Sequence, residues 1–81
     1  MTRLDAAATY RRLRSLYIVR QRSLCTVYGQ RATAEQFDTD AHRYLHHVAG
    51  FAGETPTPAE YVYAARAMLC RVMPDFEAHV A

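Results

Sequence analysis

Residues 4–28 read LDAAATYRRLRSLYIVRQRSLCTVY, a stretch without glycine or proline that ends at Gly29. On a period of 3.6 residues one side of this stretch is apolar. The apolar positions are Ala6, Tyr10, Leu13, Leu16, Tyr17, Leu24 and Val27. Arginines follow the opposite side. The pattern predicts a long first helix that buries one face against a core and offers a basic face elsewhere.

Two further helices are predicted from their capping signals. Thr33 and Gln36 form a capping box before residues 34–49, and Gly50 ends that helix. The run Thr57-Pro58-Ala59-Glu60 combines an N-cap threonine with proline at the first helical position. We therefore expect one all-α domain over residues 1–81. It is a small three-helix bundle with helices at about 3–28, 34–49 and 58–73 and a short C-terminal helical turn at 75–80.

The basic residues are unusual in kind and in distribution. All ten are arginine, which is typical of a GC-rich genome, and each guanidinium can pair bidentately with carboxylate or phosphate. Up to Ala34 there are seven arginines and one acidic residue, whereas from Glu35 onward there are three arginines and seven acidic residues. The asymmetry has two explanations, attraction between packed helices or a basic face for an acidic partner.

The chain carries no sign of secretion or of a membrane span. Cys25 and Cys70 lack the density of a disulfide framework, and no signal peptide precedes them. We expect both cysteines to be reduced and the protein to be cytoplasmic, without contact to a membrane.

Enzyme signatures are missing from the sequence. It contains no phosphate-cradling glycine loop, no Gly-x-Ser-x-Gly elbow and no Cys-x-x-Cys pair. We expect a protein that is not an enzyme, with no catalytic residues and no cofactor.

One polar stripe of the second helix has metal-ligand spacing. Asp38, His42 and His46 recur every four residues, and such a set can meet part of a zinc or nickel geometry. A solvated helix face with an Asp38–His42 pair explains the same spacing. Because a metal would need another ligand from a different element, such as His79, we predict no metal and keep these three residues as candidates.

The basic face of the first helix is the main candidate for binding. Arg11, Arg14 and Arg22 surround Ile18 there, a mixture of arginine and aliphatic groups enriched at protein interfaces. Tyr63, on the outer side of the third helix, is a further candidate. Alternatively, the C-terminal tail or a second copy of the chain covers Ile18 and Val19.

Arg20 interrupts the apolar stripe and has two explanations. Its stem can lie along the stripe while the guanidinium reaches the rim. Alternatively, it forms an internal salt bridge to Glu35, Asp38 or Glu60.

These patterns predict a non-enzymatic binding module that docks on a protein or nucleoprotein partner through the first helix, with a homodimer as a further option. Its size and composition suit a small accessory or inhibitor protein of a bacterium, phage or mobile element, anti-CRISPR proteins being one such class. The alternative is a nucleic-acid-binding transcriptional regulator that uses the same arginines on phosphates.

Overall fold

In the computed structural model, residues 3–23, 32–48, 50 and 55–76 are described. They form helices α1 (Arg3–Ser23), α3 (Ala34–His47) and α4 (Pro58–Val72). The predicted all-α three-helix bundle is confirmed. Residues 24–28 of the predicted first helix and 77–80 of the predicted C-terminal turn lie outside the described residues. Residues 74–76 form a turn, which includes the first two residues of the predicted one, and the Phe76 amide donates to the Met73 carbonyl at 3.0 Å.

The N-caps predicted for the second and third helices make their expected hydrogen bonds. Thr33 Oγ1 accepts from the Gln36 amide at 3.1 Å, and Thr57 Oγ1 accepts from the Glu60 amide at 3.3 Å. Each bond satisfies an amide that has no partner within its helix. Gly50 has φ +76°, the left-handed conformation that favours glycine after a helix. The second and third predicted helices each end one or two residues early, at His47 and Val72.

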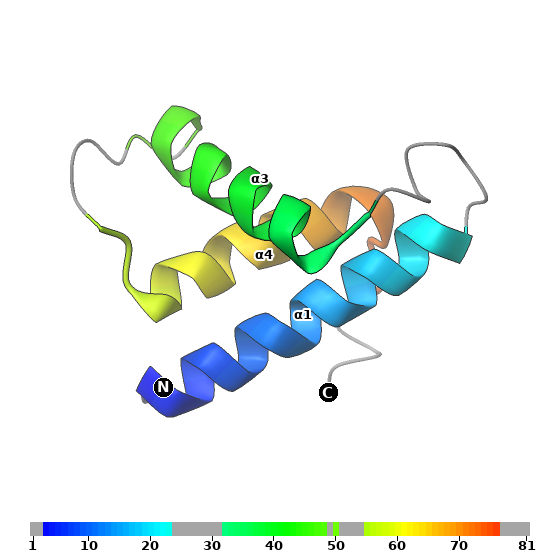
Figure 1. The fold of residues 1–81 in the computed structure, drawn as a ribbon, viewed down its shortest axis with the longest axis horizontal. Helices are drawn as coiled ribbons and strands as arrows, with labels where there is room; N and C mark the ends of the chain where they lie inside the picture. Colours follow the sequence, from blue (N-terminus) through cyan, green and yellow to red (C-terminus); the bar gives the residue numbers. More distant parts are fainter. Residues whose placement is uncertain (1–2, 24–31, 49, 51–54, 77–81) are drawn as a thin grey trace.

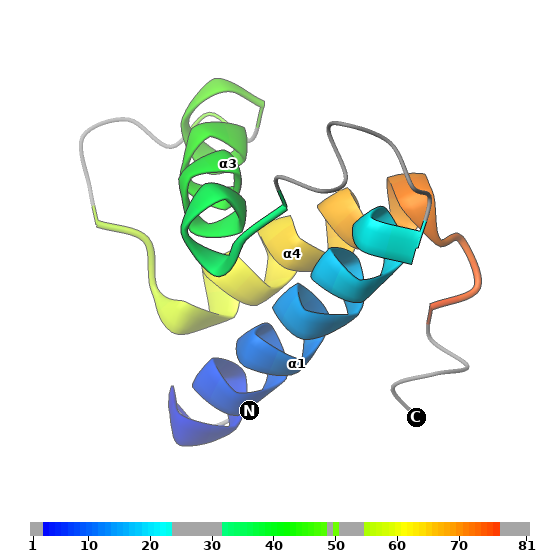
Figure 2. The same cartoon turned by 45° about the vertical axis from the view of Figure 1, so that its right-hand side comes forward.

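The helices α1 and α4 run side by side in the same direction, and α3 lies across them (Figures 1 and 2). Helix α1 packs mainly against α4 and makes its smallest interface with α3. At 1.5 Å per residue, the 21 residues of α1 span about 31 Å, which fits within the 36 Å long axis of the molecule.

The core lies where the three helices meet. Four large side chains are fully buried there: Leu13, Phe37, Leu45 and Leu69. Phe37 of α3 reaches α1, where its ring lies 5.7 Å from that of Tyr10 and 5.0 Å from that of Tyr17. Tilted pairs at such distances stabilise aromatic clusters beyond the area that they bury. Phe37 is therefore the main apolar link between α3 and α1.

Three positions differ from the sequence pattern. Val48 follows Phe37 by eleven residues, a spacing that predicts the same buried side of the helix, but it is 67% exposed because it caps the end of α3. Gln21 is buried, and its side-chain amide donates to the Tyr17 hydroxyl at 3.0 Å. Arg20 is exposed, and its Nε donates to the Val72 carbonyl at 3.4 Å. Its guanidinium thus lies at the rim, and the internal salt bridge expected as the alternative is wrong.

Replacing Phe37 with Ala should remove the link between α3 and α1. Such truncations cost about 3–5 kcal/mol, which approaches the whole stability of a small domain. We expect Phe37→Ala to lose the cooperative urea transition followed by circular dichroism. The control, Val19→Ala, changes a residue that is 67% exposed and should stay within about 0.5 kcal/mol of the parent protein. A parent-like transition in Phe37→Ala would contradict this role.

Candidate binding surfaces

One side of α1 faces solvent along the whole helix. We call it the α1 outer face, and its exposed members are Leu4, Ala8, Arg11, Arg12, Ser15, Val19 and Arg22. Leu4 is 82% exposed and Val19 is 67% exposed, so two large aliphatic side chains stand among the arginines. Figure 1 shows α1 at one edge of the molecule, with α4 and α3 on the same side of it.

The predicted site residues on α1 are not equally free. Arg11 and Arg12 are exposed, and neither has a hydrogen bond or ion pair with the residues that the structure describes. Arg22 is exposed, but its Nε and Nη2 both donate to the Ala32 carbonyl, at 3.2 and 3.0 Å. Ile18 is half-buried at the margin of the face. Among the described side chains of this surface, the arginines without a bonding partner are therefore Arg11 and Arg12.

Arg14 has an internal partner. Its Nη1 lies 3.1 Å from Asp38 Oδ2 of α3, in a salt bridge whose side chains are 24% and 47% exposed. The Tyr10 hydroxyl donates to the same carboxylate. Burial and the hydrogen bond to Asp38 raise the pKa of Tyr10 well above its ordinary value of 10. Two side chains of α1 thus converge on one carboxylate of α3.

Tyr63 belongs to a different surface. It is 58% exposed on α4, and its ring lies 6.2 Å from that of Tyr44 on α3. Burial, followed by the hydrogen bond with Tyr63, raises the pKa of Tyr44 above its ordinary value. The described contact of Tyr63 is thus with α3, and the structure does not join this residue to the arginines of α1.

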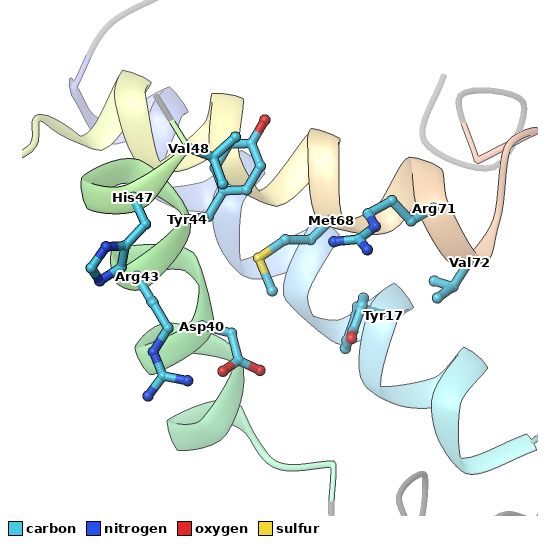
Figure 3. Close-up of a pocket in the computed structure, with 9 residues that line it drawn as sticks. All are labelled: Tyr17, Asp40, Arg43, Tyr44, His47, Val48, Met68, Arg71 and Val72. Carbon is cyan, nitrogen blue, oxygen red and sulfur yellow. The ribbon is translucent and has the colours of Figure 1, made fainter. Parts of the chain in front are cut away.

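The three helices also enclose an open cleft of about 670 Å³ (Figure 3). Nine residues line it: Tyr17, Asp40, Arg43, Tyr44, His47, Val48, Met68, Arg71 and Val72. Tyr17 comes from α1, five residues come from α3 and its cap, and Met68, Arg71 and Val72 come from α4. Met68 is buried among them. No local sequence pattern indicates this cleft, because its residues are far apart in the chain.

The candidate metal ligands do not converge. The rings of His42 and His46 lie 4.4 Å apart, but His42 Nδ1 lies 3.1 Å from the Tyr61 hydroxyl. Asp38 faces away from this pair, toward Tyr10 and Arg14 of α1. Within the described ranges, no group of three or more His, Cys, Asp or Glu side chains could hold a metal ion. His79 lies outside the described residues.

Cys70 is exposed and free, whereas Cys25 lies outside the described residues. None of the described helices is long and apolar enough to cross a membrane.

Comparisons with protein-family models, with curated proteins and with solved structures found no significant match to this chain.

The Arg14–Asp38 pair should show a measurable coupling energy. In a double-mutant cycle with Arg14→Gln and Asp38→Asn, we expect about 0.5–1 kcal/mol in urea denaturation, because the pair is only partly shielded from water. The coupling should shrink in 1 M salt.

The matched control cycle combines Arg12→Gln with Asp38→Asn. It should show no coupling, since no bond joins Arg12 to a described residue. Additive effects of Arg14→Gln and Asp38→Asn would show that this salt bridge does not hold α3 on α1.

Proposed function

We propose that this chain is a non-enzymatic, cytoplasmic binding module that docks on an acidic surface of a protein partner through the α1 outer face. The observation that carries the proposal is the pairing of the exposed Leu4 and Val19 with Arg11 and Arg12, which have no partner among the described residues. Aliphatic groups supply buried area and arginines supply charge-assisted hydrogen bonds, a combination typical of protein interfaces.

The shape of the surface favours insertion into a groove of the partner. From Leu4 to Arg22 the outer face extends about 27 Å along a single helix. A single helix face is narrow compared with a standard interface of about 800 Å² per partner. A partner that surrounds the helix, as in helix-in-groove recognition, would also contact its margins, including Ile18.

The positive charge of the α1 outer face disfavours a symmetric dimer formed through this face and favours a different, acidic partner. A symmetric dimer would place the same surface patch on both sides of the interface. Arg11, Arg12 and Arg22 of the two copies would then face one another, and like charges at an interface cost several kcal/mol. An acidic partner removes this penalty and also accelerates association.

The rival function is nucleic-acid binding by the same arginines. Phosphate contacts would also use Arg11 and Arg12, but they give no reason for Leu4 and Val19 to be exposed on the same face of the helix. If the partner is a protein, the small size and the arginine-only basic set suit an accessory or inhibitor protein of a bacterium, phage or mobile element. Anti-CRISPR-like inhibitors are one such class.

Charge reversal tests the outer face directly. The partner is first captured from nuclease-treated lysate of a GC-rich bacterium and purified, and its Kd is then measured for each variant. We expect Arg11→Glu/Arg12→Glu to weaken binding about a hundredfold, equivalent to about 3 kcal/mol. The control, Arg43→Glu/Arg71→Glu, makes the same change of charge outside α1 and should bind as the parent does. The pair Arg14 and Arg22 is less suitable, because both make bonds within the fold.

Three results would contradict the proposal. One is equal binding by Arg11→Glu/Arg12→Glu and the parent protein. Another is binding to bare DNA or RNA that weakens steeply with salt, which would favour the rival function. The third is a concentration-dependent dimer in sedimentation that Arg11→Glu/Arg12→Glu alters, which would assign the face to self-association.

A further inference from the structure

We propose that the cleft between α3, α1 and α4 is a binding site for a small organic anion with an apolar body, such as an aliphatic carboxylate. The site is separate from the α1 outer face, since the two share no residue. It does not depend on the proposed function. Its volume of about 670 Å³ falls within the range of ligand pockets, about 300–1,000 Å³.

The floor of the cleft is suited to an apolar body. The buried Met68 lies between the α3 wall and Tyr17 of α1, and Val72 and Val48 stand at its margins (Figure 3). Methionine is flexible and polarisable, so its side chain adapts to different apolar shapes. Val48, 67% exposed, can lose solvent contact when a ligand covers it. These groups supply the hydrophobic part of the binding free energy.

The cationic group above this floor is Arg71. Figure 3 shows its side chain running from α4 toward Met68 and Tyr44, so the guanidinium lies over the cleft. Its charge acts on Tyr44, where it opposes the rise in the pKa of that phenol. Within the part of the chain that the structure describes, Arg71 has no hydrogen bond or ion pair. It can therefore pair with a ligand carboxylate in a bidentate manner.

A second hydrogen-bond donor, the Tyr17 hydroxyl, lies on the same side of Met68 as Arg71 (Figure 3). The Tyr17 hydroxyl accepts a hydrogen bond from the buried Gln21, which fixes its oxygen, and its own proton has no acceptor among the described residues. A phenol that already accepts one bond can still donate one. The Tyr44 hydroxyl, by contrast, lies at the end of its ring away from Met68 (Figure 3). Tyr17 and Arg71 are thus the two groups near Met68 that can hold a carboxylate.

The charges of the cleft favour an anion over a cation. Arg43 and Arg71 line it with only one carboxylate, that of Asp40. Asp40 Oδ1 already accepts from the Gln36 side chain at 2.9 Å, and Figure 3 shows Asp40 beside Arg43, on the side away from Arg71. A cationic head group at Arg71 would meet like charge, whereas a carboxylate would meet two donors.

The experiment titrates the full chain with decanoate, below its micelle-forming concentration, while observing methionine methyl groups by ¹³C NMR. Met68 lines the cleft, and Met73, which packs against the core outside the cleft lining, is an internal control. We expect the Met68 methyl signal to shift and saturate while the Met73 signal moves less. Decyltrimethylammonium, with the same chain and the opposite charge, should bind at least about tenfold more weakly, as expected for loss of charge-assisted hydrogen bonds.

Matched variants locate the head group. Arg71→Gln should weaken decanoate binding about tenfold, and Tyr17→Phe, which keeps the ring, about threefold. Arg12→Gln is the control, because it removes the same charge from the α1 outer face, and should leave the affinity unchanged. Equal affinity of the two amphiphiles, an unmoved Met68 signal, or decanoate affinity unchanged in Arg71→Gln would each overturn the proposal. None of these results bears on the α1 outer face, whose test uses a protein partner.

Discussion

The attachment of α3 to α1 depends on two consecutive residues, Phe37 and Asp38. Phe37 packs its ring beside Tyr10 and Tyr17 of α1. Asp38 accepts hydrogen bonds from the Tyr10 hydroxyl and the Arg14 guanidinium. The interface between α1 and α3 is the smallest of the three, so these contacts carry most of it. An aromatic contact fills the buried side of this interface, and a charge-assisted network closes the half-exposed side.

This anchor determines which surfaces remain available. Because it engages Arg14, the cations of α1 that bond to no described residue are those farther around the helix, Arg11 and Arg12. Beyond Phe37, α3 leaves Tyr17 and Met68 to line the open cleft. One short segment of α3 thus explains both why Arg14 is not available on the outer face and where the cleft opens.

The helices could be predicted from sequence because their signals are local. Thr33, Thr57 and Pro58 act on amides within one turn, and periodicity identifies Phe37 and Leu69 as inward-facing. The partner of an arginine is not a local property. Periodicity placed Arg14 on the outer side and Arg20 in the apolar stripe, whereas the crossing of α3 puts Arg14 against Asp38 and leaves Arg20 at the rim.

The cleft was still harder to predict from the sequence, because it depends on contacts between all three helices. Tyr17 and Met68 have the spacing of core residues in their own helices, and Arg71 has that of a solvated position. Only the relative placement of the three helices brings them to one opening. Gln21 is the polar residue that periodicity could have identified, since position 21 follows Tyr17 by one helical turn on the buried side. Its role in fixing the Tyr17 hydroxyl still required the structure.

The division of charge along the chain has a partly internal explanation. Attraction between a basic α1 and an acidic α3 is realised in the Arg14–Asp38 pair. Arg22 bonds to a backbone carbonyl, and Arg11 and Arg12 bond to no described residue, so internal attraction does not account for these three. Charges that the fold does not use repel one another on a single helix and slightly destabilise it. A partner that supplies carboxylates would reverse the sign of that contribution, and this gives a small domain a physical reason to retain a basic outer face.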